Sequence, residues 1–210
     1  MKGLTSYHLK LLAAGLMVVD HLGAVFFPEA DWPRMIGRIS FPLFVWLLVQ
    51  GEAHTKSIGR YGLRLALLGL ISQPIYQLIF DVDRFNILFE LLIGLACLRV
   101  TRHRPWPMQA AIWLLAAGAT ELFDISYGSY GIGLIWLTRY FQPTVIWGLG
   151  WAGFHLVWVP LMGAFQLPAI AAPLLFWAAN GDRGPRARWF YIFYPGHLLL
   201  LLLVEGFLMP

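Results

Sequence analysis

The sequence predicts an all-α polytopic membrane protein with about nine transmembrane helices, and two features of its composition support this fold class. Of its 210 residues, 59% are hydrophobic and only 12% are charged, whereas soluble domains carry about 25% charged residues. The apolar runs are long, and "HLLLLLLVEGFL" (residues 197–208) lacks the alternation of a membrane β-strand. We therefore expect one integral-membrane domain over residues 1–210, with little room for a separate soluble domain.

Apolar windows separated by polar residues, proline or glycine are the nine candidate spans. They cover residues 5–27, 34–53, 59–80, 86–100, 107–123, 129–141, 144–164, 167–180 and 188–208. The sixth and eighth windows are shorter than the ~20 residues that a straight span needs. These two are tilted helices, re-entrant pieces or half-helices, so the count carries a margin of one or two.

The basic residues predict the orientation of the spans. With the N-terminus inside, Arg34, Arg38 and Arg84 fall in the outer half, and the other twelve of the 15 lysines and arginines fall in the inner half. Because basic loops stay on the cytoplasmic side of a membrane, we expect an N-inside, C-outside arrangement.

The first span carries an ionisable pair in the otherwise apolar stretch "LMVVDHLGAVFFP" (residues 16–28). No small-residue cleavage site follows, so we expect a retained helix and not a signal peptide. Burial of Asp20 and His21 in hydrocarbon is costly unless they are used or paired, and a histidine beside a carboxylate suits proton transfer. Lys10 lies eleven residues before His21, which places both on one helix face about 16 Å apart. Alternatively, the pair only hydrogen-bonds between packed helices.

Two arginines four residues apart share a face at the start of the second span, in "RMIGRISFP". We expect Arg34 and Arg38 to neutralise Asp20 or to hold a developing oxyanion, although Arg34 alone also suits snorkelling to the outer interface. Pro42 predicts a kink in this helix. The polar residues at its inner end form either an anion site or an ordinary cytoplasmic loop; they are Glu52, His54, Lys56, Arg60 and Arg64.

Two further spans place polar side chains in the expected bundle interior. Asn86 and Glu90 share a stripe of the fourth span, where they line a cavity or pair with an arginine such as Arg38. In the last span, Tyr194 and His197 are three residues apart. His197 is a second deep histidine, with either a site role or a packing role.

The sequence lacks the motifs of several common catalytic and binding sites. The sequence contains no HExxH zinc motif, Walker A loop, nucleophile elbow or dinucleotide-binding glycine fingerprint, and we expect no bound metal. The basic clusters carry no signature of a nucleic-acid-binding fold, so we interpret them as topology signals or an anion site and expect no nucleic-acid partner.

Four stretches together resemble the TraX family, named for the protein that acetylates the pilin of conjugative F-type plasmids. They are "LKLLAAGLMVVDHLGAVFFP", "MIGRISFPLFVWLLVQGEAHT", "RFNILFELLIGL" and "YIFYPGHL", with the weaker "DISYGSYGIG" also fitting. The resemblance runs from residue 9 to residue 198. Lys10 and His21 also reproduce the basic residue, ten-residue interval and histidine in the first membrane helix of the integral-membrane acyltransferase-3 superfamily.

The resemblance implies an acetyltransferase of the bacterial inner membrane that uses cytosolic acetyl-CoA as donor, with a protein N-terminus or a glycan hydroxyl as acceptor. His21 would be the central catalytic group, oriented by Asp20, and Arg38 would stabilise the oxyanion. The expected acceptor-binding residues are Lys10, Arg34, Asn86, Glu90, Tyr194 and His197. The expected CoA-binding residues are His54, Lys56, Arg60 and Arg64.

Two functions of other classes fit the same residues. Buried Asp, Glu and His side chains also suit a proton-coupled transporter, although no two-fold repeat of broken helices is detected. A non-catalytic subunit of a conjugation or secretion machine would need only the aromatic-rich surface.

Overall fold

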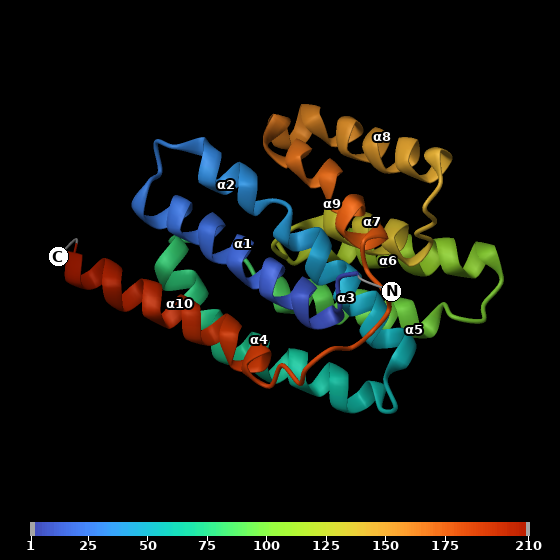
Figure 1. Ribbon diagram of the computed structural model, residues 1–210, viewed down its shortest axis with the longest axis horizontal. Helices are drawn as coiled ribbons and strands as arrows, with labels where there is room; N and C mark the ends of the chain where they lie inside the picture. Colours follow the sequence, from blue (N-terminus) through green and yellow to red (C-terminus); the bar gives the residue numbers. More distant parts are fainter. Residues whose placement is uncertain (1–2, 209–210) are drawn as a thin grey trace. The chain divides into compact units, whose positions relative to one another are not determined.

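The computed structural model describes residues 3–208, and its regular elements in that range are helices (Figure 1). They are α1 (Ser6–Phe26), α2 (Asp31–Gly37), α3 (Ser40–His54), α4 (Ile58–Phe80), α5 (Ile87–Val100), α6 (Trp106–Leu122), α7 (Gly128–Arg139), α8 (Val145–Met162), the 3-10 helix η1 (Gly163–Ala171), α9 (Ala172–Trp177) and α10 (Trp189–Leu208). The all-α prediction is therefore confirmed for the described residues. Lys2, one of the basic residues assigned to the inner half, lies outside them.

Four segments of the described chain are long and apolar enough to cross a membrane. They are Ser6–Phe26, Ile58–Phe80, Val145–Trp177 and Trp189–Leu208. These segments indicate a multi-pass membrane protein. The count of about nine spans and the N-inside orientation stay predictions.

The second predicted span is two helices, and the predicted kink at Pro42 is wrong. α2 ends at Gly37, a turn follows, and α3 starts at Ser40. Pro42 therefore lies in the first turn of α3, where a backbone N–H has no partner within the helix and its loss costs little. The break places Arg38 in the turn between the two helices.

The eighth predicted span also differs from the structure. Residues of this window form the second half of η1 and the short helix α9, which ends at Trp177. Pro168 lies inside η1 and Pro173 lies in the first turn of α9. Since proline has no N–H to donate, the two prolines explain why no continuous α-helix forms here.

The chain forms two compact units, which are described separately. Among the described residues, unit 1 comprises 3–47, 141–193 and 203–208, and unit 2 comprises 48–140 and 194–202.

Unit 1 is built around a helical hairpin of α1 and α2, with α8 and η1 packed on each other and η1 in contact with α2 (Figure 1). Thr5 caps α1 by accepting a hydrogen bond from the backbone N–H of His8, whose side chain in turn accepts from the N–H of Thr5. Trp151 and Phe176 are buried in an aromatic cluster, where Phe176 also stacks on Trp46 at 4.8 Å. These contacts stabilise the packing of unit 1, which contains the candidate residues from Lys10 to Arg38.

Unit 2 packs α4 on α5 and packs α5, α6 and α7 on one another. Two connections meet at one end of this bundle, because Phe85 and Ile125 form a parallel β-bridge. Gly94 permits a close approach of α5 to α7, since a Cβ there would lie 2.3 Å from the Cδ1 atom of Ile135. The bundle carries the remaining candidate residues.

Candidate functional site

The centre of the candidate site is an ion pair between Asp20 of α1 and Arg38, which follows α2. Nη2 of Arg38 donates to both carboxylate oxygens of Asp20, at 2.7 and 3.0 Å. Nε of Arg38 donates to the carbonyl oxygen of Arg34 at 3.3 Å. The side chains of Asp20 and Arg38 are only 14% and 11% exposed. Of the two roles expected for Arg38, the structure shows the one in which it neutralises Asp20.

The ion pair depends on how closely α2 approaches α1. A Cβ at Gly37 would lie 2.3 Å from the Cβ of Asp20 and 2.7 Å from its Cα. At Gly23, a Cβ would lie 2.7 Å from the Cβ of Pro33. Only residues without a side chain permit these distances. The two glycines therefore allow the hairpin to close and place Arg38 against Asp20.

Phe165 of η1 is a further neighbour of this site that sequence analysis missed. The guanidinium carbons of Arg34 and Arg38 lie 4.8 and 4.9 Å from the centre of its ring, within the range of a cation–π contact. Nε of Arg34 is buried and has no hydrogen-bond partner among the described residues. No sequence signal pointed to Phe165, because it lies more than 120 residues after the arginines it contacts.

His21 and Lys10 lie on α1, which is continuous from Ser6 to Phe26. Their eleven-residue spacing therefore places them on one helix face, as expected. His21 is half-buried, and Nζ of Lys10 lies 5.5 Å from the ring centre of Phe190. The observed partner of Asp20 is Arg38, so the orientation of His21 by Asp20 stays a prediction.

Asn86 has an architectural role in unit 2. Its side-chain oxygen accepts from the N–H of Leu88 and caps α5, and its amide donates to the carbonyl of Gly69 and the side chain of Gln73, both at 2.8 Å. Both amide hydrogens and the amide oxygen thus have partners within the fold. These bonds account for the complete burial of Asn86, and its predicted contact with a substrate stays untested.

Glu90 is also fully buried, and its carboxyl lies against the first turn of α7. A Cβ at Gly131 would lie 2.5 Å from Oε1 of Glu90. The partial positive charge of a helix N-terminus favours a carboxylate at this position. Among the described residues Glu90 forms no ion pair, so the expected pairing with an arginine is not observed.

Tyr194 and His197 lie together on α10, as their spacing predicts. Their ring centres are 5.5 Å apart in an edge-to-face arrangement, and both side chains are buried. Tyr194 interacts with the backbone of Ile87 at the start of α5. These two residues therefore belong to the interior of unit 2.

The expected CoA-binding residues surround the connection between α3 and α4. His54 is the last residue of α3, and its Nδ1 lies 2.8 Å from the carbonyl oxygen of Gln50. The other three are Lys56, Arg60 and Arg64, and all four side chains are exposed. The arrangement is an exposed basic turn.

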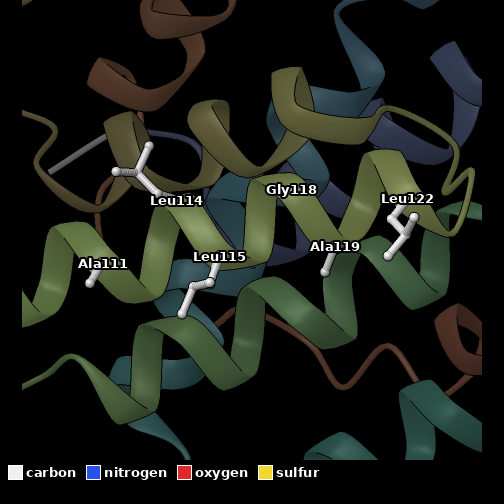
Figure 2. Close-up of a pocket in the computed structure, with 6 residues that line it drawn as sticks. All are labelled: Ala111, Leu114, Leu115, Gly118, Ala119 and Leu122. Carbon is white, nitrogen blue, oxygen red and sulfur yellow. The ribbon is translucent and has the colours of Figure 1, made fainter.

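A hollow of about 640 Å³ lies on α6, and none of the candidate residues lines it (Figure 2). Its lining is wholly apolar and consists of Ala111, Leu114, Leu115, Gly118, Ala119 and Leu122. Leu114 and Leu115 are each 73% exposed, which is typical of a lipid-facing helix surface. The hollow offers no polar group to a nucleotide or an acceptor. In the described part of the chain, no group of three His, Cys, Asp or Glu side chains is placed to hold a metal ion.

Comparison with known proteins identifies the family. The chain is 27% identical to the probable fimbrial assembly protein FimC, serogroup H1, of Dichelobacter nodosus over 237 aligned positions, which cover 97% of each protein. It is 36% identical to Protein TraX of Escherichia coli over 129 positions, which cover 59% of this chain and 51% of that protein. No solved structure matches it. The family model described as TraX protein matches residues 6–205, so the chain belongs to the TraX family, as its sequence motifs indicate.

Proposed function

We propose that this protein is a membrane-embedded acetyltransferase that moves an acetyl group from acetyl-CoA to an acceptor such as the N-terminus of a pilin-like protein. Membership of the TraX family supports the reaction class. The name of the full-length relative, a probable fimbrial assembly protein, supports a fimbrial subunit as acceptor over a glycan. The observation that carries the proposal is that His21 follows Asp20 in the apolar helix α1, and that Asp20 forms a nearly buried ion pair with Arg38.

The ion pair fixes the part of α1 that carries His21. Taking two charges out of water costs several kcal/mol per ion, so such a pair persists where its geometry is close to ideal. Here one guanidinium nitrogen contacts both carboxylate oxygens, and Phe165 lies against the guanidinium. A guanidinium held in this way has the preorganisation that stabilisation of an oxyanion requires. Asp20 in turn holds the segment of α1 from which His21 projects.

His21 would act as the general base. The acceptor amine or hydroxyl attacks the carbonyl carbon of the thioester, and His21 takes the proton that the acceptor loses. The tetrahedral intermediate, with its oxyanion near Arg38, then collapses. The carbon–sulfur bond breaks, and the leaving thiolate of CoA recovers the proton from His21. The products are the acetylated acceptor and CoA, so atoms and charges balance. A transient acetyl-histidine is the alternative route for the same exchange.

The two substrates would approach from different sides of the inner membrane. The exposed basic residues around the α3–α4 connection suit the phosphates of CoA, since guanidinium and ammonium groups both bind phosphate. They are His54, Lys56, Arg60 and Arg64. We assign the acceptor side to Lys10, Arg34, Asn86, Glu90, Tyr194 and His197. His21 lies about 16 Å along α1 from Lys10, further from the cytoplasmic end.

A thiol-release assay tests the proposal. The full chain, purified in detergent, is incubated with acetyl-CoA and a synthetic peptide that carries the N-terminus of a fimbrial subunit. We expect peptide-dependent release of CoA thiol and a mass increase of one acetyl group on the peptide amine. A peptide with a blocked N-terminus is the matched control. Folded protein that releases no thiol with peptide or glycan acceptors would contradict the proposal.

A second candidate function is a non-catalytic subunit of a fimbrial assembly machine. It is favoured by the name of the relative that matches 97% of the chain, which mentions assembly and no reaction. The two functions differ in cells that produce His21→Ala protein. If fimbriae assemble normally while their subunit loses an acetyl group, the protein is the enzyme. If wild-type cells carry no acetylated subunit and fimbriae are lost only when the whole protein is absent, it is an assembly component.

A further inference from the structure

Unit 2 carries most of its charges at two opposite ends. The β-bridge between Phe85 and Ile125 joins the α4–α5 and α6–α7 connections at one end. Four acidic residues lie in or beside these connections, namely Asp81, Asp83, Glu121 and Asp124. The C-terminal ends of α5 and α7 and the start of α6 lie at the other end, where the charges are basic (Figure 1). This second end is called the basic end below.

Three arginines lie at the basic end, and two of them contact one buried carboxylate. Nη1 of Arg99 lies 3.3 Å from Oε1 of Glu52, and Nη1 of Arg102 lies 3.8 Å from the same oxygen. Nη1 of Arg139, at the end of α7, donates to the hydroxyl of Thr101 and, at 3.3 Å, to the carbonyl oxygen of Leu98. Two guanidinium groups thus face one carboxylate, and that of Arg139 is held by the neighbouring residues Leu98 and Thr101, which leaves an excess of positive charge.

The exposures show how the cluster is layered. The side chain of Glu52 is 8% exposed, whereas those of Arg99 and Arg102 are 44% and 38% exposed. The carboxylate therefore lies beneath the two arginines and orients them, while part of each guanidinium reaches the surface. A planar guanidinium held from behind by a carboxylate presents its remaining N–H groups as a fork that matches phosphate oxygens.

Exposed aromatic side chains surround the same cluster. Tyr140 lies under Arg139 at 5.6 Å and donates from its hydroxyl to Gln109 at 2.8 Å. Trp136 contacts Tyr140 edge to face at 5.6 Å. Trp106 at the start of α6 is 79% exposed, and Trp136 and Tyr140 are 42% and 44% exposed. Tryptophan and tyrosine gather at the level of lipid headgroups, where an aromatic ring and a polar edge are both accommodated.

We propose that Arg99, Arg102 and Arg139 form a binding site for the phosphate of an anionic phospholipid headgroup. Exposed aromatic rings beside the arginines suit a phosphate that is held at a membrane surface. An anionic phospholipid provides such a phosphate, which meets the guanidinium groups while the acyl chains follow the apolar helices. A free nucleotide phosphate shares the charge but does not use the aromatic surroundings. The inference is independent of the proposed acetyl transfer.

Titration of the delipidated full chain in detergent tests the site, with short-chain phosphatidylglycerol as probe and phosphatidylcholine of the same chain length as reference. We expect tighter binding of phosphatidylglycerol, weakened by salt. Each basic residue near a membrane surface contributes about 1 kcal/mol, so Arg102→Gln is expected to raise the Kd for phosphatidylglycerol about fivefold. Arg84→Gln removes the same charge at the opposite, acidic end and is the matched control.

A second variant separates a loss of lipid binding from a loss of folding. Glu52→Gln with Arg99→Gln removes both partners of one ion pair, so no buried charge is left without its counter-charge. It is expected to lose the preference for phosphatidylglycerol and to retain the elution profile of the folded protein. Equal affinity for the two lipids, or an unchanged preference in both variants, would overturn the proposal. Displacement of phosphatidylglycerol by CoA at matched concentration would instead assign the cluster to a nucleotide phosphate and overturn the lipid assignment.

Discussion

Unit 1 and unit 2 each join a carboxylate of one helix to arginine outside that helix, but the two ion-pair sites differ in burial and geometry. Asp20 and Arg38 in unit 1 are 14% and 11% exposed, with a shortest contact of 2.7 Å. In unit 2, Glu52 is only 8% exposed, but its arginine partners are 38–44% exposed and lie 3.3 and 3.8 Å away. The same two residue types therefore form one nearly buried contact and one that reaches the surface.

The difference shows that burial, and not residue type, decides whether an ion pair stabilises the fold or stays available to a ligand. A buried pair leaves an uncompensated charge when one partner is removed, so it fixes the helices that carry it. A pair with exposed arginines is worth little to stability, because water competes for the guanidinium groups. Those groups are then available to a ligand at the surface. Each of the following variants tests or refines this contrast.

The largest expected effect is on turnover, at His21 beside the buried pair. We expect His21→Ala to lower the rate of acetyl transfer by a factor of about 10²–10⁴, which is the typical contribution of a general base. Thiol release at saturating acetyl-CoA measures the rate. Leu22→Ala, one residue further along α1 and partly exposed, is the matched control. Near-normal turnover by folded His21→Ala protein would remove His21 from the mechanism.

The second expected effect is on stability, at the buried pair itself. Arg38→Ala leaves the Asp20 carboxylate without its counter-charge, and breaking such a pair lowers the free energy of unfolding by about 3–5 kcal/mol. Arg38→Lys should be nearly as harmful to activity, since an ammonium does not reproduce the planar geometry of the guanidinium. Thermal unfolding in detergent and the thiol-release rate measure the two effects. A lysine variant with full activity would show that Arg38 supplies charge only.

The close approach of α1 and α2 can be tested without changing any charge. Gly37→Ala inserts a Cβ that would lie 2.3 Å from the Cβ of Asp20, so the helices must separate, at a cost of about 1–3 kcal/mol for overpacking. Gly15→Ala on α1 is the control, because nothing lies within 4 Å of its added Cβ. We expect a lower Tm and lower activity for Gly37→Ala alone. Equal behaviour of the two variants would contradict the glycine argument.

A smaller effect is expected where exposed cations would meet the donor. Loss of one exposed charged contact costs up to about 1 kcal/mol, so Arg60→Ala should raise the KM for acetyl-CoA by up to about fivefold. The same should hold for Arg64→Ala, while the KM for the acceptor changes little. Arg84→Ala controls for the loss of one positive charge. If both substitutions leave the KM unchanged, the phosphates of CoA bind elsewhere.

The smallest expected effect concerns the exposed member of the unit 2 pair. Arg102→Ala removes a 3.8 Å contact of a side chain that is 38% exposed, so the free energy of unfolding should change by less than about 1 kcal/mol in the absence of lipid. Chemical denaturation in detergent provides the comparison with Arg38→Ala. A loss as large as that at Arg38 would erase the distinction between the two sites.

Most helices could be predicted from the sequence, because each depends on a local run of apolar residues. The predicted window 59–80 is the helix Ile58–Phe80, and the window 107–123 is the helix Trp106–Leu122. The prediction was wrong where an apolar run contains backbone that is not a continuous α-helix. The turn after Gly37 lies in a mostly apolar window, and the 3-10 helix at Gly163–Ala171 is itself apolar, so both windows resemble membrane helices.

The candidate functional residues could be identified from the sequence, since ionisable side chains in apolar runs are visible without a structure. Asp20, His21 and Arg38 were found in this way, as were Glu90 and His197. The sequence also determined the family, through short motifs.

Only the tertiary structure decided the partners of these residues. In the structure Asp20 pairs with Arg38, and Phe165 lies against two arginines. The side-chain amide of Asn86 donates hydrogen bonds to Gly69 and Gln73. The physical reason is that helix periodicity fixes which face a side chain shares, but not which other helix covers that face. That choice depends on how closely two backbones approach, and at Asp20 the approach is set by the missing side chain of Gly37.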